Sequence, residues 1–124
     1  MSEQRFTIST ATALMPEVRL RVSEIVRLRA DLTELSFELR HCGSSRLGGR
    51  AEAKACEARL GEHLLWFDEQ GIQIKSIAPF LIDFPAELDG RQVLLCWLEG
   101  EPEIAWYHRP ELGFAARRPL PRRP

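Results

Sequence analysis

Apolar residues in the first third of the chain recur at the spacing of an amphipathic helix. Between Leu14 and Leu39 they follow alternating steps of four and three, interrupted only at Arg21, which predicts a coiled-coil-like helix. Thr7 is a suitable N-cap for the first turn. Pro16 lacks an amide donor, so we expect it to end a short first helix and to start the longer one.

A glycine- and serine-rich segment over residues 43–49 predicts a chain reversal after this helix. The second helical stripe consists of Ala53, Cys56, Leu60, Leu64 and Phe67. Gly71 is well placed to end that helix in a left-handed conformation. The two helices should therefore pair antiparallel as a helical hairpin over residues 8–70.

The apolar period changes to that of β-strands after Gly71. Short apolar runs broken by Pro79 and Pro85 lead to Asp89-Gly90, a strong signal for a two-residue hairpin turn. Residues 92–98 then form a strand, residues 99–102 a turn, and residues 103–108 another strand. The sequence thus predicts an α+β fold, in which the hairpin packs on a three- to four-stranded antiparallel sheet in the region 72–108.

Strand register decides which side chains share a face of this sheet. The Asp89-Gly90 turn places Asp83 opposite Cys96, and a four-residue second loop would place Val93 opposite His108. One face, expected to pack on the helices, then carries Ile82, Phe84, Val93, Leu95, Trp97, Ile104, Trp106 and His108. The other face carries Leu81, Asp83, Leu94, Cys96, Leu98, Glu103 and Tyr107. This second face is too apolar for water, so a second copy of the chain is the simplest cover for it.

The length and composition are those of one ordinary globular domain. The chain has 124 residues, 44% of them hydrophobic and 28% charged, and we assign residues 1–116 to a single domain and residues 117–124 to a basic Pro/Arg-rich tail. No apolar run reaches the roughly 20 residues that cross a bilayer, so a cytoplasmic protein without membrane contact is expected. A net charge of −1 makes nucleic acid an unlikely partner, with the arginine tail as the alternative route to one.

Polar residues of the C-terminal third are the candidates for chemistry. Glycine-rich phosphate loops, serine elbows, zinc-protease helices and CxxC pairs are absent from the sequence, which argues against an enzyme without excluding one. Imidazole and carboxylate donors could still hold zinc, iron or manganese. The candidate ligand- or metal-binding residues are Asp83, Cys96, Glu103, His108 and Glu111.

Each of these residues also has a structural interpretation. His108 at the end of an aromatic face could make a single hydrogen bond, and Asp83 could form an ion pair with Arg91 or with an arginine of the tail. The three cysteines, Cys42, Cys56 and Cys96, are read as reduced thiols, because their number is odd and their spacing fits no metal motif.

The helical seam and the outer sheet face are the candidate surfaces for self-association. A seam arginine can pair across an interface, and strand aromatics can contact a second copy. We expect a homodimer whose interface candidates are Arg21, Leu28, Leu35, Trp97 and Tyr107.

A run of residues in the C-terminal half carries a family resemblance. It reads from Phe80 through Asp83-Phe84-Pro85-Ala86 and Leu95-Cys96-Trp97 to Trp106-Tyr107-His108, followed by Gly113-Phe114-Ala115. With Phe6-Thr7 and Leu14-Met15-Pro16 near the start, it resembles an uncharacterised bacterial family, domain of unknown function 2203. The resemblance covers nearly the whole chain. It implies a helical region before a C-terminal motif region and supplies no activity.

The sequence therefore supports two functions of different classes. The first is a non-enzymatic protein-interaction or small-ligand-binding module. The alternative is a metal-binding enzyme or enzyme accessory protein that uses the His/carboxylate residues of the C-terminal sheet.

Overall fold

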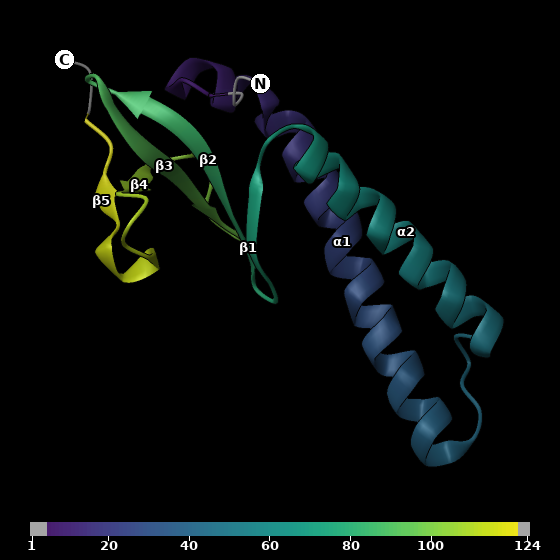
Figure 1. The fold of residues 1–124 in the computed structure, drawn as a ribbon. Coiled ribbons are helices and arrows are strands. Elements are labelled where there is room, and N and C mark those ends of the chain that lie inside the picture. Colours follow the sequence, from purple (N-terminus) through teal and green to yellow (C-terminus); the bar gives the residue numbers. More distant parts are fainter. Residues whose placement is uncertain (1–4, 122–124) are drawn as a thin grey trace. The chain divides into compact units, whose positions relative to one another are not determined.

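The computed structural model describes residues 5–121 and confirms the α+β class (Figure 1). Two helices, α1 (Ile8–Cys42) and α2 (Arg50–Glu69), precede five strands. The strands are β1 (Gln73–Ile77), β2 (Phe80–Leu88), β3 (Arg91–Leu98), β4 (Trp106–His108) and β5 (Arg118–Pro119), with a 3-10 turn η1 (Phe114–Ala116) before the last one. The chain divides into two compact units, Arg19–Trp66 and the combination of Met1–Val18 with Phe67–Pro124.

The Arg19–Trp66 unit is an antiparallel helical hairpin. The thiol of Cys56 donates a hydrogen bond to the Leu28 carbonyl at 3.2 Å, and Arg21 Nη1 lies 3.3 Å from His63 Nδ1. The later residue of α1 contacts the earlier residue of α2 and the reverse, which is the antiparallel pairing that the sequence predicts. Gly43 follows α1 with φ of +77°, the left-handed conformation that glycine adopts at little cost.

Helix α1 runs without a break through Pro16, so the prediction of a separate short helix is wrong. The proline removes the donor that would pair with the Thr12 carbonyl, but both residues are exposed, so water can satisfy that carbonyl. Ala11, Met15 and Val18, at 2% exposure or less, continue one buried stripe across the site. Burial of this stripe offsets the local cost of the proline.

The start of α1 is capped by two threonines. The Thr10 amide donates to Thr7 Oγ1 at 3.0 Å, and the Thr7 amide donates to Thr10 Oγ1 at 2.8 Å. This is the reciprocal pattern of a capping box, with a threonine where glutamate or glutamine is usual. The predicted N-cap at Thr7 is confirmed.

The second unit is built on a five-stranded antiparallel sheet with the order β1-β2-β3-β4-β5. It has more strands than the three to four expected, because β1 pairs with β2 and the C-terminal segment contributes β5. Asp89 and Gly90 have φ values of +52° and +78° and form the predicted two-residue turn between Leu88 and Arg91.

Alternation along the strands gives the sheet two faces, and both are buried near the centre. One face carries Phe80, Ile82, Phe84, Ala86, Val93, Leu95, Trp97 and Tyr107. Phe6 packs edge-on against Phe84 of this face, with ring centroids 5.3 Å apart. The other face carries Leu81, Asp83, Pro85, Leu94, Cys96, Leu98, Trp106 and His108. Neither of the two helices, within residues 5–121, is long and apolar enough to cross a membrane.

Candidate functional site

Three polar side chains meet on the second face of the sheet and form a cluster that we call the buried triad. It consists of Asp83 from β2, Cys96 from β3 and His108 from β4. One ligand atom from each lies within 4.8 Å of the other two. The three residues are 2%, 0% and 4% exposed, respectively. Three of the five predicted ligand residues thus come together in a place shielded from solvent.

The pairing of β3 with β4 brings His108 into the triad and corrects the predicted register. Asp83 lies opposite Cys96 as expected, but His108 lies opposite Leu94, not Val93. The prediction that Asp83 and His108 point to opposite faces is therefore wrong. A shift of one residue moves every side chain of a strand to the other face.

The shift arises because the connection between β3 and β4 is longer than four residues and spans 99–105. Glu101 shapes its first part: its amide donates to the Leu98 carbonyl, and its backbone carbonyl accepts from Trp97 Nε1. Glu103 to Ala105 then stay outside the β3–β4 ladder, and Ala105 accepts from the Leu120 amide instead.

Hydrogen bonds fix the His108 ring at both nitrogens. Nδ1 lies 2.8 Å from the Arg109 carbonyl oxygen, which can only accept, so Nδ1 carries a proton. Nε2 lies 3.1 Å from Asp83 Oδ2. Since Nδ1 is already protonated, a second proton must lie between Nε2 and the carboxylate for this contact to be a hydrogen bond. Asp83 Oδ1 is buried and has no hydrogen-bond partner among the residues that the structure describes.

Cys96 is a neutral thiol in this environment. Burial, and after it the negative charge of Asp83, raise the pKa of its Sγ–H group to about 12. The Arg117 guanidinium, with Nη1 at 3.9 Å from Cys96 Sγ, opposes this shift without reversing it. The thiol is therefore not a free nucleophile near neutral pH.

Arg117 covers the triad side of the sheet although it belongs to the segment predicted to be a basic tail. Its guanidinium contacts both carboxylate oxygens of Glu101, at 2.9 and 3.1 Å. It also lies between two aromatic rings, 4.7 Å from the Trp106 centroid and 4.2 Å from that of Phe114. The pKa of Arg117 is raised by Glu101 and Cys96 against the opposing effect of burial, which keeps the group charged. Arg117 is thus part of the folded structure.

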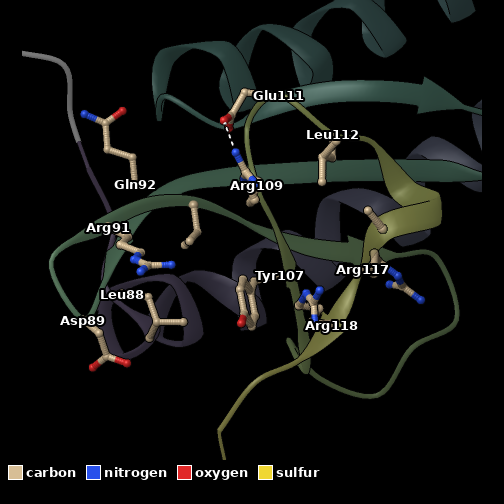
Figure 2. A pocket seen from close by; sticks show the side chains of 12 residues that line it. Leu88, Asp89, Arg91, Gln92, Tyr107, Arg109, Glu111, Leu112, Arg117 and Arg118 are labelled. Carbon is tan, nitrogen blue, oxygen red and sulfur yellow. Dashed lines mark hydrogen bonds and ion pairs between the residues drawn. The ribbon is translucent and has the colours of Figure 1, made fainter.

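A pocket of about 1190 Å³ lies where β3, β4 and β5 meet the connecting segments (Figure 2). We call it the arginine pocket. Its lining residues are Leu88, Asp89, Arg91, Gln92, Val93, Tyr107, Arg109, Glu111, Leu112, Ala116, Arg117 and Arg118.

Strand alternation explains which side chains reach this pocket. Tyr107 pairs with Arg118 across β4 and β5, and with Leu95 across β3 and β4. Arg91 lies four residues before Leu95 in β3, so its side chain is on the same face as those of Leu95 and Tyr107. Figure 2 shows the guanidinium groups of Arg91 and Arg118 on either side of the Tyr107 ring, while Arg117 extends away from it.

Two of the four arginines in the pocket have a carboxylate partner. Arg109 pairs with Glu111 at 2.7 Å, and this pair lowers the pKa of Glu111; Arg117 pairs with Glu101. The side chains of Arg91 and Arg118 are exposed and make no hydrogen bond or ion pair with any residue in the described range 5–121. They are therefore available to a ligand.

None of the remaining predicted site residues belongs to the triad. Glu103 and Glu111 are exposed and lie outside the triad. Among the interface candidates, Leu28, Leu35 and Trp97 are buried at 2–3% exposure and so present no surface to a second copy. Arg21 lies over the Trp66 ring at 4.6 Å, and Tyr107 lines the arginine pocket.

The sequence did not predict that Arg91 and Arg118 line a pocket, or that Arg117 packs within the folded structure. The adjacent arginines Arg117 and Arg118 before a proline were a usable signal, because successive residues of an extended segment point to opposite sides. The signal was weak, since proline-rich basic ends are commonly solvated.

Fold and sites together define a small α+β domain with an antiparallel sheet that carries a buried carboxylate–thiol–imidazole cluster. The chain belongs to the family described as "Uncharacterized conserved protein (DUF2203)", whose model matches residues 4–120. No curated protein and no solved structure matches the chain significantly.

Proposed function

We propose that this chain is a small-ligand-binding domain and that its ligand is a small organic anion held in the arginine pocket. The observation that supports this most directly is the pair of exposed guanidinium groups of Arg91 and Arg118 beside Tyr107, which have no partner among residues 5–121. The anionic group would be a phosphate or a carboxylate, the two groups whose oxygens match the planar guanidinium fork.

Electrostatics favours an anion at this position. Two like charges that share a pocket repel each other, and a bound anion adds two attractions that offset this repulsion. The Arg109–Glu111 and Arg117–Glu101 pairs are already neutralised internally. Asp89 also lines the pocket, but its carboxylate points away from Tyr107 in Figure 2.

The apolar part of the lining indicates that the ligand is more than an inorganic ion. Leu88, Val93 and Leu112 offer hydrocarbon surface next to the arginines. With a volume of about 1190 Å³, the pocket is also large enough to hold an organic molecule. The Tyr107 hydroxyl adds a neutral donor that can orient an oxygen of the ligand.

The lining favours binding over catalysis. Among the described residues that line the pocket, none is a cysteine, a histidine or a serine, the side chains that most often act as nucleophile or base. The triad residues His108 and Cys96 are buried and do not line the pocket. This agrees with the non-enzymatic interpretation of the sequence.

Isothermal titration calorimetry with pyrophosphate and with succinate tests the proposal and distinguishes phosphate from carboxylate ligands. We expect saturable binding of at least one probe, weakened about tenfold or more in Arg91→Gln and in Arg118→Gln, because each removes a charged hydrogen bond. Arg46→Gln, which changes an exposed arginine of the interhelical loop, is the matched control and should bind like the wild type. Binding should weaken as salt rises.

Two results would overturn the proposal. One is the absence of saturable binding for both probes at low salt with a correctly folded protein. The other is equal binding by the wild type, the two pocket variants and the Arg46→Gln control, which would indicate nonspecific attraction to basic surface.

A further inference from the structure

We propose that Asp83, Cys96 and His108 form a binding site for a single divalent transition-metal ion of the zinc type. This inference goes beyond the anion-binding function and does not depend on it, because the triad residues are not among those that line the arginine pocket. The three side chains supply one oxygen, one sulfur and one nitrogen donor from three neighbouring strands.

The orientation of His108 is that of a metal ligand. Its Nδ1–H donates a hydrogen bond to the Arg109 carbonyl at 2.8 Å. This type of contact fixes the ring of a metal-binding histidine and leaves Nε2 as the atom that binds the metal. Nε2 points at Asp83 Oδ2 from 3.1 Å. Two donor atoms bound tetrahedrally at zinc distances lie about 3.3 Å apart, so little movement is needed to admit the ion between them.

Asp83 supplies a second, independent observation. Its side chain is 3% exposed, and its Oδ1 atom is buried without a hydrogen-bond partner in the described part of the chain. An unsatisfied buried oxygen costs free energy in the metal-free protein. A metal ion gives this atom a partner, either directly as a second carboxylate donor or through a water on the ion.

Charge and donor type select the ion. One carboxylate and one thiolate carry two negative charges, which a divalent cation neutralises inside the protein. The ion displaces two protons, one from Cys96 Sγ and one from the His108–Asp83 contact. Mixed sulfur, nitrogen and oxygen donors suit zinc, and also cobalt(II) as its spectroscopic substitute, better than magnesium or calcium.

Arg117 completes the surroundings of the site. Its Nη1–H lies 3.9 Å from Cys96 Sγ and can donate to a thiolate there. Its charge is already balanced by Glu101, so it orients the sulfur without adding net positive charge to the site. We therefore assign Arg117 as a positioning residue for the ligand Cys96.

Cobalt(II) titration monitored by absorption tests the site. The protein carrying Cys42→Ser and Cys56→Ser, in which Cys96 is the only thiol, should bind one equivalent and show a thiolate-to-cobalt band with intense visible bands of tetrahedral cobalt. Adding Cys96→Ser should abolish the thiolate band, and Asp83→Asn or His108→Gln should weaken binding about a hundredfold or more. Glu103→Gln, an exposed carboxylate outside the triad, is the control.

A thermal melt keeps the test decisive if a triad variant fails to fold. Zinc should raise the melting temperature of the wild type and of the Arg91→Gln/Arg118→Gln protein alike, which separates this site from the anion pocket. The proposal is overturned if the single-thiol protein gives no thiolate band and zinc does not raise its melting temperature. It is equally overturned if the cobalt band persists after Cys96→Ser.

Discussion

His108 Nε2 lies 3.1 Å from Asp83 Oδ2 although the two residues belong to β4 and β2, with β3 between them. The contact spans the sheet face above Cys96 and Leu94. It links two strands that share no backbone hydrogen bonds, and it is buried at both ends. A polar link of this kind contributes to stability only while both partners are present.

The first prediction concerns the loss of stability when either Asp83 or His108 is removed. In chelator, Asp83→Ala and His108→Ala should each lower the free energy of unfolding by about 3–5 kcal/mol, because either change leaves a buried polar group without its partner. The double variant should lose clearly less than the sum, since the partner of each is already gone. Urea denaturation measures all three, with Glu103→Ala as an exposed control expected within about 0.5 kcal/mol of the wild type. Additive losses would mean that the two side chains are not coupled.

A second prediction follows from the pKa of Cys96, which is raised from 9.0 to about 12 in the folded protein. The unfolded thiol ionises first as pH rises, so above pH 9 the unfolded state binds fewer protons than the folded state. The free energy of unfolding should fall by up to about 1.4 kcal/mol per pH unit between pH 9 and 12. Below pH 9 the contribution is fully present.

The comparison with Cys96→Ser isolates this effect from the other groups that titrate in alkali. Denaturant melts at several pH values should show a smaller loss of stability for Cys96→Ser than for the wild type across the window. Parallel curves for the two proteins would show that the Cys96 thiol is not protected from ionisation.

Thiol reactivity gives a third prediction. Cys42 is exposed, Cys56 is intermediate, and Cys96 is buried with a raised pKa. A maleimide or disulfide reagent at pH 8 should therefore modify Cys42 first and Cys96 last, at a rate limited by opening of the fold. Mass spectrometry of the labelled peptides orders the three sites. Rapid modification of Cys96 in the native protein would contradict its placement in the sheet core.

Adjacent arginines near the C-terminus provide a fourth, internally controlled prediction. Arg117→Gln should lower the free energy of unfolding by about 1–3 kcal/mol, because it breaks the two-oxygen contact with Glu101 and the stacking on Trp106 and Phe114. Arg118→Gln should change it by less than about 0.5 kcal/mol, since this side chain is exposed and has no partner in the part of the chain that the structure describes.

Lysine at position 117 should not restore stability, because an ammonium group cannot reproduce the planar contact with both carboxylate oxygens of Glu101 or the stacking on the aromatic rings. Thermal or urea denaturation of Arg117→Lys decides this point. Equal effects of the Arg117 and Arg118 variants would mean that the two side chains do not differ in their surroundings as the structure shows.

The sequence was informative where local chemistry alone determines structure. Asp89-Gly90 requires a two-residue turn, and this turn correctly aligned Asp83 with Cys96. The helical hairpin followed from apolar periodicity and from the glycine-rich segment after Cys42. The α+β class needed no tertiary information.

Prediction failed where tertiary contacts overrode local signals. Pro16 is a strong helix breaker, yet the buried stripe through Met15 and Val18 keeps α1 continuous. The path of residues 99–105 depends on two hydrogen bonds, one from the Glu101 amide to the Leu98 carbonyl and one from Trp97 Nε1 to the Glu101 carbonyl. No turn signature in the sequence of residues 99–102 reveals them. Without these hydrogen bonds, the sequence assigned His108 to the wrong face of the sheet. The triad was therefore not predicted.

The β3–β4 register decides which residues form the triad and which line the arginine pocket. Nuclear Overhauser spectroscopy of the isotope-labelled protein measures this register directly. The structure predicts cross-strand backbone contacts that link Leu95 with Tyr107 and Cys96 with Trp106. Contacts that instead link Leu95 with Trp106 and Val93 with His108 would place His108 and Asp83 on opposite faces. That result would remove the triad and contradict the account.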